Sequence, residues 1–256
     1  MKILFLGTGT SVGVPMIGCE CPVCRSCDPR NRRRRTSLYV QAAGQHIVID
    51  TPPDFREQAL TFSVPRVDAV LFTHAHADHV FGFDDIRRFN TLQDSVIPAY
   101  GSEGTIANLK RVFSYVGTER ISGFYRPRIE WVVFDGAFSI GEVSIMPLAV
   151  EHAPEGAYGF LVAAEGRRVA YVPDCHAMDD KVVSALEGVD VMILDGLRHR
   201  PHATHLTVAD SVDLLQRIGG AQSYITHICH DLDHEETQRS LPTGVSVPWD
   251  GLEVTL

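Results

Sequence analysis

The 256-residue chain lacks any apolar run near the roughly 20 residues needed to cross a bilayer, which excludes an integral membrane protein. It also lacks a cationic surplus: its formal net charge of −9 argues against broad binding to nucleic acid or anionic lipid. Only a short apolar run precedes Gly7, too short for a signal peptide, so we expect a cytoplasmic protein. No repeat, low-complexity tract or proline-rich linker is present, and we predict a single domain over residues 1–256.

Cysteine is scarce and unevenly placed, which argues against a secreted disulfide scaffold. Cys19, Cys21 and Cys24 fall within six residues, and Cys27 follows them. A tight cluster without a signal peptide indicates a metal site in a reducing compartment, and structural zinc takes four thiolate or imidazole ligands. We therefore expect a zinc-binding loop at about residues 18–35, in which Cys27 is an alternative to Cys24. The competing interpretation is that reduced cysteines pack there as small apolar side chains.

Short apolar runs separated by loops dominate the chain, which is typical of a strand-rich α/β protein. Its 45% of hydrophobic residues excludes a disordered chain. Helical spacing appears at residues 105–116, 181–186 and 208–218, and the last segment has Thr207 as its expected N-cap and Gly219 at its expected end. Strands are expected at residues 3–6, 37–42, 46–49, 67–72, 97–100, 130–134, 143–148, 158–163, 169–172, 189–194, 224–226 and 254–256.

Several of the expected strands run directly into a residue type that binds metal ions. These residues are Asp50, His74, His152, Asp174, Asp195 and His227. A single strand that ends near His or Asp carries no information. Six such ends predict one shared rim, because a rigid sheet holds the side chains at its strand ends in fixed positions.

The segment from Thr73 to His79 carries four metal-binding side chains, His74, His76, Asp78 and His79. Imidazole and carboxylate ligands suit Zn²⁺, Mn²⁺ or Fe²⁺. In an extended segment His74 and His76 point to the same side, while Asp78 and His79 can turn toward a second position. These ligands exceed what one cation needs, so the pattern predicts two cations about 3.5–4 Å apart. A solvated histidine-rich loop is the alternative, but small alanines rather than lysine or glutamate fill the gaps.

With these residues the chain resembles the metallo-β-lactamase superfamily of dinuclear hydrolases, whose hallmark is His-x-His-x-Asp-His. The resemblance covers nearly the whole chain and implies a four-layered αβ/βα sandwich with the site at one edge of two sheets. Within the superfamily the chain is similar to the phosphodiesterase family of the carbon–phosphorus lyase pathway, which cleaves phosphoribosyl 1,2-cyclic phosphate. Three segments carry this closer likeness: residues 7–15 (GTGTSVGVP), 18–24 (GCECPVC) and 226–230 (THICH).

The resemblance implies two active-site cations, Mn²⁺ or Zn²⁺, and one structural Zn²⁺. The implied active-site ligands are His74, His76 and His152 for one cation, Asp78, His79 and His227 for the other, and Asp174 as the bridge between them.

The resemblance also implies roles for residues around those ligands. His230 becomes the fourth ligand of the structural zinc, and Asp50 orients a histidine or the bound water from behind. Asp78 is a catalytic residue as well as a ligand. His205 takes the position of the family's catalytic histidine, which donates a proton or holds the phosphate, and an unperturbed imidazole pKa near 6.5 suits that role. A helix-capping or buried histidine is the alternative for His205.

Other signals are less specific. The basic run at Arg30–Arg35 predicts either phosphate or nucleic-acid contact or a solvated loop. Gly7 and Gly9 do not fit a dinucleotide-binding fingerprint, because the next glycine comes one residue too late, and a turn close to the metal rim explains them better. His199 and His202 are weaker candidates for the site. We expect three further histidines to be structural: His46, His176 and His234.

The leading hypothesis is metal-dependent hydrolysis of a small cyclic phosphodiester, with the reaction type following from the dinuclear site and the substrate from the resemblance alone. The alternatives are a nuclease of the transfer-RNA 3′-processing type, a thioester or lactam hydrolase, a relative of the pyrroloquinoline quinone biosynthesis protein, and a non-catalytic zinc-binding partner protein. Expected partners are the small-molecule phosphodiester and a second copy in a homodimer, with no membrane and no nucleic acid.

Overall fold

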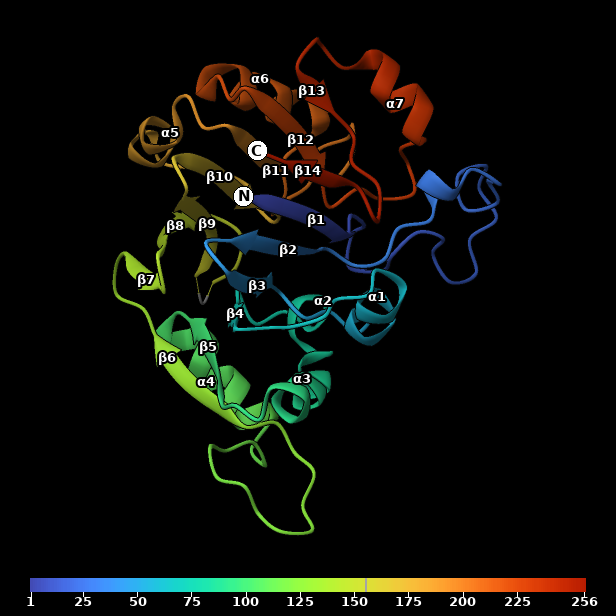
Figure 1. Ribbon diagram of the computed structural model, residues 1–256. Coiled ribbons are helices and arrows are strands. Elements are labelled where there is room, and N and C mark those ends of the chain that lie inside the picture. Colours follow the sequence, from blue (N-terminus) through green and yellow to red (C-terminus); the bar gives the residue numbers. More distant parts are fainter. Residues whose placement is uncertain (155) are drawn as a thin grey trace.

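Two seven-stranded β-sheets face each other at the centre of the protein (Figure 1). The computed structural model describes residues 1–154 and 156–256. The first sheet, in the order β14-β1-β2-β3-β4-β5-β6, consists of β1 (Lys2–Gly7), β2 (Ser37–Ala42), β3 (Gln45–Ile49), β4 (Ala69–Leu71), β5 (Ile97–Gly101), β6 (Ile129–Val133) and β14 (Glu253–Thr255). The second sheet, in the order β13-β12-β11-β10-β9-β8-β7, consists of β7 (Phe138–Ile140), β8 (Val143–Val150), β9 (Ala157–Ala164), β10 (Arg167–Val172), β11 (Val191–Asp195), β12 (Gln222–Thr226) and β13 (Val245–Ser246).

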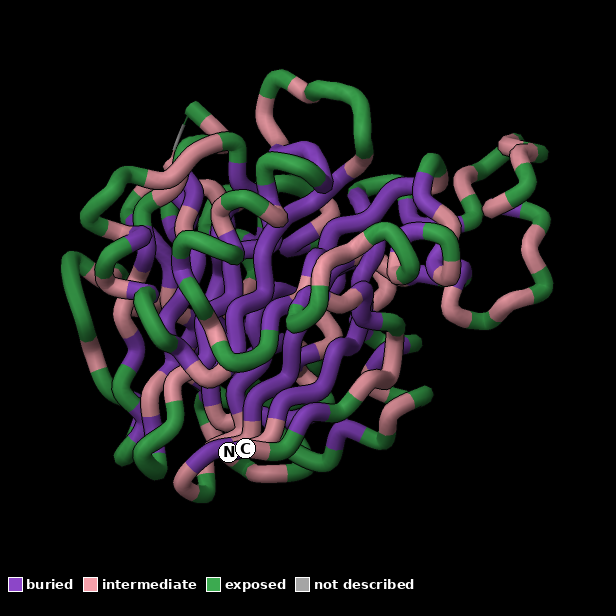
Figure 2. Tube along the Cα trace, turned by 90° about the horizontal axis from the view of Figure 1, so that it is seen from above, coloured by how far each residue is buried: buried purple, intermediate pink, exposed green. Residues whose placement is uncertain are grey.

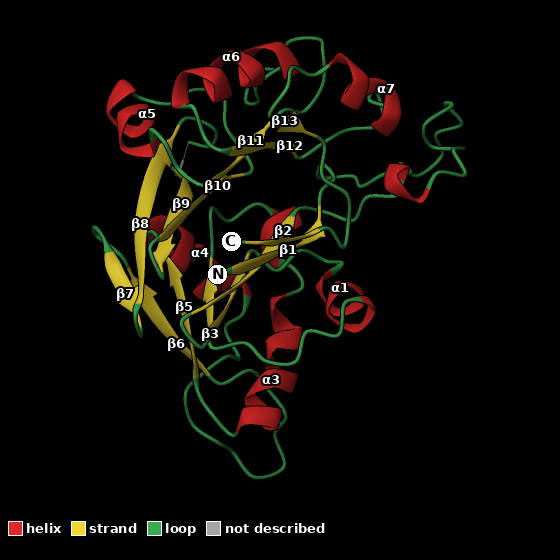
Figure 3. Cartoon of the chain, turned by 45° about the horizontal axis from the view of Figure 1, so that its top comes forward, coloured by secondary structure: helices red, strands yellow, loops and turns green. Residues whose placement is uncertain are grey.

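Helices cover the outer face of each sheet, which gives the four layers αβ/βα (Figure 3). The first sheet is covered by α1 (Phe55–Thr61), α3 (Ile86–Gln93) and α4 (Glu103–Val112), and the second by α5 (Asp180–Leu186) and α6 (Val208–Ile218). The short α2 (Ala77–Val80) follows β4, and α7 (His234–Ser240) follows β12. Among the described residues, no helix has both the length and the apolar character needed to cross a membrane. The predicted four-layered fold is confirmed.

An apolar core fills the space between the two sheets, and Figure 2 shows the buried strands at the centre of the molecule. The first sheet contributes Phe5 and Ile49 and the second contributes Phe160 and Tyr171, and each of the four is at most 1% exposed. Side chains on the opposite faces of the strands pack beneath the helices. Because each central strand is covered on both faces, its sequence is a continuous apolar run rather than an alternating one.

Local sequence patterns determine both ends of the helix α6. The Thr207 hydroxyl accepts a hydrogen bond from the Asp210 N–H (3.1 Å), and the Asp210 carboxylate accepts one from the Thr207 N–H (3.2 Å), which forms a capping box. Gly219 ends the helix in the left-handed region, with φ 65°. Both predicted ends are confirmed.

Several elements differ from the sequence predictions: β7 and β13 were not expected, and the predicted helix at 105–116 is α4, which ends at Val112. The helices α1, α2 and α7 were not predicted, because each is short and buries only two side chains, too few for a clear 3.6-residue repeat. The predicted strand at 67–72 is paired only over β4, although Val67 and Phe72 beside it are fully buried. Buried residues are apolar whether or not their backbone pairs with a neighbouring strand. The apolar run at 67–72 therefore predicts a longer strand than the paired residues of β4.

The topology brings strand ends from both sheets to one edge. In the first sheet β3, β4 and β5 are parallel, and in the second β10, β11 and β12 are parallel. Carboxyl ends of parallel strands meet at the same edge of a sheet. The two edges come together, since His79, beyond β4, lies 3.2 Å from Asp174, beyond β10. The predicted rim is therefore assembled from both halves of the chain.

Truncating the inter-sheet core should destabilise the protein strongly. We expect Phe160→Ala to lower the free energy of unfolding by about 3–5 kcal/mol, because the ring is fully buried and a cavity would remain. The matched control is Phe124→Ala, whose ring is 66% exposed, and it should change stability by no more than about 0.5 kcal/mol. Urea unfolding of both variants checks this, and equal losses would contradict the assignment of the core.

Candidate metal centre

All seven predicted active-site ligands meet at the shared edge of the two sheets. Four come from the segment between β4 and the end of α2, and one each follows β8, β10 and β12. They are His74, His76, Asp78, His79, His152, Asp174 and His227. The polar contacts among them fall into two groups joined by one carboxylate.

The first group consists of three imidazoles. His74 Nε2 lies 2.9 Å and His152 Nε2 lies 3.3 Å from His76 Nδ1. His74 and His76 are two residues apart in an extended segment and face the same side, as predicted. His152 arrives from the other sheet, beyond β8. The three nitrogens make a compact site of the kind that a borderline divalent cation prefers.

The second group consists of Asp78, His79 and His227. The Asp78 carboxylate lies 3.3 Å from His79 Nε2 and 3.7 Å from His227 Nε2. Asp78 and His79 sit in the single turn α2, beyond the extended segment that holds His74 and His76, and the His79 ring lies 4.2 Å from the His74 ring between centroids. The separation of the histidine motif into two groups follows from this change from extended to helical backbone.

Asp174 lies between the two groups and contacts both. One of its oxygens is 3.2 Å from His79 Nε2, and the other is 3.4 Å from His152 Nε2 and 3.4 Å from His227 Nε2. The side chain is 3% exposed. Of the seven residues it has the position that a bridging carboxylate would need.

The histidine rings are held from behind by hydrogen bonds. His152 Nδ1 donates to the Thr204 carbonyl oxygen (2.8 Å), and His79 Nδ1 lies 2.7 Å from the Asp50 carboxylate. Asp50 also accepts hydrogen bonds from the Thr73 N–H (2.9 Å) and hydroxyl (2.8 Å). A ring that donates from Nδ1 must present the lone pair of Nε2 to the site, which is the arrangement found at metal-binding histidines.

Several nitrogen and oxygen atoms of the cluster are not satisfied by hydrogen bonds to each other and are therefore free to bind a cation. Among the described residues, His79 Nε2, Asp174 Oδ1 and His227 Nε2 are buried and have no hydrogen-bond partner. Buried polar atoms without partners are rare and costly. Imidazole lone pairs and two carboxylates that converge on a buried space form donor groups that could hold metal ions, so the residues present fit the divalent cations that the superfamily implies.

The electrostatics keep the Asp174 carboxylate ionised. Burial alone would raise the pKa of Asp174, but His227 and His79 outweigh it and hold the pKa well below its ordinary value. The same reasoning applies to Asp78, whose pKa is lowered by His79 and His227 against the effect of burial. Both oxygens of each carboxylate are thus available as cation ligands near neutral pH.

Two site residues hold the backbone in the left-handed region, which side chains rarely adopt. Asp50 follows β3 with φ 65°, and His227 follows β12 with φ 59°. Such conformations cost roughly 1–3 kcal/mol each and persist where neighbouring contacts fix them. The Asp50 N–H donates to the Leu71 carbonyl (2.9 Å), so the sheet itself holds that turn. At each of these residues the backbone changes direction directly after the strand, and this places the side chain in the site.

His205 adjoins the ligand cluster and is paired with a carboxylate that the sequence reasoning left without a role. His205 Nδ1 lies 2.7 Å from Asp195, and His205 Nε2 lies 4.0 Å from Asp174. Asp195 is fully buried at the end of β11 and also accepts from the Cys175 N–H (2.9 Å). Burial and the neighbouring His227 lower the pKa of His205 to about 4. The only sequence signal for Asp195 was its place at a strand end.

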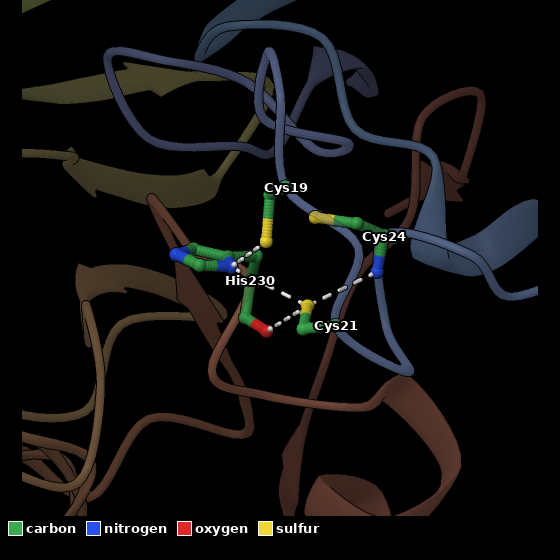
Figure 4. Close-up of side chains that lie close together, drawn as sticks. All are labelled: Cys19, Cys21, Cys24 and His230. Atoms are coloured by element: carbon green, nitrogen blue, oxygen red, sulfur yellow. Dashed lines mark hydrogen bonds between the residues drawn. The ribbon is translucent and has the colours of Figure 1, made fainter.

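The cysteine cluster forms a second, separate donor group (Figure 4). The sulfurs of Cys19 and Cys21 lie 3.3 and 3.4 Å from His230 Nδ1, and Cys24 completes the group. Ligands at about 2.3 Å (sulfur) and 2.0–2.1 Å (nitrogen) around a tetrahedral ion would be about 3.6 Å apart. The structure places Cys24 in the group and leaves Cys27 exposed outside it. The Cys24 N–H and His230 lower the pKa of Cys21 to about 6, which favours the thiolate form.

Most arginines of the basic run Arg30–Arg35 form hydrogen bonds or ion pairs with other groups of the protein. Arg33 is 3% exposed and donates to the Thr8 hydroxyl and the Pro248 carbonyl, both at 2.7 Å. Arg35 pairs with Asp54 (3.0 Å), and Arg30 pairs with Asp28 (2.7 Å). Of the two interpretations left open, the run is neither a free anion surface nor a wholly solvated loop.

The glycines before this run make close approach possible, as predicted. A Cβ at Gly7 would lie 2.0 Å from the Arg35 carbonyl oxygen, and one at Gly9 would lie 2.9 Å from Arg33. The same segment pairs with Ile228, since the Ile228 N–H donates to the Thr8 carbonyl (3.0 Å). Ile228 follows His227, so the glycine turn does lie against the metal rim.

The comparisons with known proteins agree with this architecture. A family model described as the beta-lactamase superfamily domain matches residues 45–228. A solved structure of a diphosphatase from the PhnP family is 39% identical, with a TM-score of 0.90, and the match covers 99% of this chain and 96% of that one. The fold and the buried donors thus define a metal-dependent hydrolase. The chain belongs to the metallo-β-lactamase superfamily and lies close to the PhnP family.

Two further matches are less specific. An octanoyltransferase of Porphyromonas gingivalis is 32% identical over 260 residues, covering 100% of this chain and 52% of that protein, so the chain spans about half the length of this relative. The structure of Zn²⁺-bound PqqB from Methylobacterium extorquens matches with a TM-score of 0.82 at 20% identity, covering 100% of both chains. That level of identity shows a shared fold.

The cysteine group predicts a metal that stabilises the fold. Cys21→Ser should bind one equivalent of zinc less than the unchanged protein and should unfold at a lower temperature, because the N-terminal loop would lose its tether to His230. Cys27→Ser is the matched control and should keep the full zinc content. Metal analysis with thermal unfolding checks both variants, and an unchanged zinc content in Cys21→Ser would refute the site.

Proposed function

We propose that this protein is a phosphodiesterase that hydrolyses a small, cyclic phosphodiester such as phosphoribosyl 1,2-cyclic phosphate with the help of two divalent cations, Mn²⁺ or Zn²⁺. The observation that carries the proposal is the convergence of seven histidine and aspartate side chains around the Asp174 carboxylate. The similarity to a PhnP-family diphosphatase over almost the whole chain supports phosphoryl chemistry.

The ligand residues supply the binding site for both cations and the substrate anion. His74, His76 and His152 would hold one cation, Asp78, His79 and His227 the other, and Asp174 both. Cations bound there polarise phosphoryl oxygens and lower the pKa of a coordinated water toward about 7. Asp50 fixes the His79 ring, and the Thr204 carbonyl fixes the His152 ring, so the donors are in place before substrate arrives.

His205 and Asp195 are the pair that we propose to move the proton. With Nδ1 turned to Asp195, His205 exchanges protons through Nε2, which faces the cluster near Asp174. The pKa of His205 is lowered to about 4 rather than kept near 6.5, so the ring is neutral at rest near neutral pH and must first take up the proton that the attacking water loses. We therefore infer that His205 delivers its proton to the departing alkoxide and that Asp195 keeps the ring in the required orientation.

Other hydrolytic reactions remain as the alternatives that experiment must separate. The octanoyltransferase likeness covers only half of that protein, so an acyl thioester belongs in any substrate panel. Short RNA belongs there too, because the superfamily includes nucleases, although the basic run that would have contacted RNA is tied to internal carboxylates.

The first test removes the bridging carboxylate. Asp174→Ala should lower metal content and reduce kcat/KM for bis-p-nitrophenyl phosphate and for phosphoribosyl cyclic phosphate by roughly 10³-fold or more, since several kcal/mol of charge stabilisation is lost. Asp135→Ala, at an exposed carboxylate, is the control and should change neither quantity. Hydrolysis of a thioester or short RNA, but of no phosphodiester, by the unchanged metal-loaded protein would replace the proposed reaction.

The second test separates proton transfer from metal binding. His205→Ala should retain its metals and slow the cleavage of substrates with poor leaving groups by roughly 10²–10⁴-fold, with a smaller effect on p-nitrophenyl esters, whose leaving group needs no proton. His199→Ala, an exposed histidine of the same loop, should behave as the unchanged protein. The measurement is kcat across a leaving-group series, and equal slowing of all the esters would rule out a general acid.

A further inference from the structure

A pocket of about 550 Å³ lies between the helix α3 and the loop at residues 113–128, which joins α4 to β6. The loop projects from the molecule at the bottom of Figure 1. All of its residues are described, and they include no helix or strand. Connections of this length without secondary structure are uncommon in compact domains and usually serve a function. None of the residues that line the pocket belongs to the seven active-site ligands or to the cysteine group.

Polar contacts fasten the loop to α3 and to the turn before it. The Tyr115 hydroxyl donates to the Asp84 carboxylate (2.7 Å), and Arg128 donates to the Asn90 carbonyl oxygen in α3 (3.2 Å). The Arg126 guanidinium donates to the Tyr115 carbonyl oxygen (2.7 Å) and so closes the loop on itself. A loop that is already held at several points loses less conformational entropy when a ligand binds. The pocket is therefore formed in advance of binding.

Two neighbouring aromatic rings contribute to the wall of the pocket. Phe124 and Tyr125 both line it, and both are more than half exposed. The Arg87 guanidinium lies 5.1 Å from the centre of the Tyr125 ring, and this cation–π contact holds Tyr125 beside α3. Adjacent exposed rings with a polar rim are typical of interaction sites, and their faces suit the stacking of a planar group.

The charges of the pocket favour an anion. Its charged lining residues are Arg87, Arg120, Arg126, Arg128, Asp94 and Glu119. Four cations against two carboxylates make a local positive surplus on a chain whose net charge is −9. The Asp94 carboxylate is 75% exposed and is shared by Arg128 (3.1 Å) and Arg120 (3.4 Å). Two guanidiniums that share one exposed carboxylate keep N–H donors for a further anion, and their fork geometry matches phosphate.

We propose that this pocket is a second ligand site, separate from the metal centre, which binds a phosphate monoester attached to a planar ring, of the chemical class of a nucleoside monophosphate. The ring stacks on Phe124 and Tyr125. The phosphate binds Arg120 and Arg128 and takes the place of the Asp94 carboxylate between them. The volume of the pocket is within the range of roughly 300–1,000 Å³ that is usual for small-molecule sites. The site goes beyond the proposed hydrolysis and does not depend on it.

Calorimetry of the metal-loaded protein with adenosine 5′-monophosphate tests the ligand class. The nucleotide should bind at least tenfold more tightly than adenosine or ribose 5-phosphate, because only the nucleotide offers both the ring and the phosphate. Asp174→Ala damages the metal centre and should retain one site for the nucleotide with unchanged affinity. Loss of nucleotide binding in folded Asp174→Ala, as verified by circular dichroism, would place the nucleotide at the metal centre and overturn the proposal.

Variants of the pocket test the placement of the ligand. Phe124→Ala and Arg120→Ala should each weaken nucleotide binding at least fivefold, and both remove exposed side-chain atoms that the fold does not need. Arg111→Ala, at an exposed arginine of α4 outside the pocket, is the matched control and should leave the affinity unchanged. Binding that neither pocket variant weakens, or tighter binding of short single-stranded RNA than of the nucleotide, would contradict the site as a small-molecule pocket.

The carboxylate between the arginines provides a test with the opposite sign. Asp94→Asn should strengthen nucleotide binding at least threefold, because it removes the negative charge that competes with the phosphate for Arg120 and Arg128. Asparagine tolerates the left-handed backbone of this position (φ 45°), so the variant should fold. An unchanged or lower affinity in Asp94→Asn would refute the binding of the phosphate at these two arginines.

Discussion

The buried carboxylate of Asp174 is the contact on which the rest of the site depends. It touches imidazoles that arrive from both sheets: His79 from beyond β4, and His152 and His227 from beyond β8 and β12. The apolar core holds the two sheets at a fixed distance, and this distance determines whether the two ligand groups share one carboxylate. The architecture and the chemistry are therefore coupled, because any shift of one sheet against the other would separate the donors.

Each sheet also supplies a buried aspartate that positions a histidine from behind. Asp50, at the end of β3, faces His79, and Asp195, at the end of β11, faces His205. In both pairs the histidine Nδ1 contacts the aspartate carboxylate, and the histidine Nε2 faces the site. The two pairs differ in what the free nitrogen meets: His79 lies among carboxylates, whereas His205 lies beside the cluster, 4.0 Å from Asp174. The same local device can thus serve cation binding in one place and proton transfer in the other.

The N-terminal loop connects the structural cysteine group to the rim. Cys19 and Cys21 reach His230, three residues beyond His227, and the glycine segment pairs with Ile228 between them. The loop is therefore fixed to the residues that directly follow His227, which holds a left-handed conformation at this turn. A metal in the cysteine group would act on the active site through this backbone rather than through the reacting atoms.

Local patterns in the sequence indicated a strand-rich α/β chain and candidate metal-binding residues, whereas the four-layered fold and the complete candidate ligand set followed from the family resemblance. The spacing within residues 73–79, the three cysteines in six residues, and the cap and glycine of α6 are short-range features that a single pass along the chain reveals. The apolar runs likewise identified most strands. Their limits were less certain, as the short β4 shows, because burial and sheet pairing leave the same apolar signature.

Only the tertiary structure decided which residues act together across the two sheets. The pairing of Asp195 with His205, the burial of Arg33 within a run that looked like a surface patch, and the pocket beside α3 all join segments that are distant in the sequence or carry no local motif. A charge in a sequence does not say whether it meets solvent, a partner or a cation. That outcome is fixed by the packing of the two sheets, because packing determines which polar groups lose their water and must find one another.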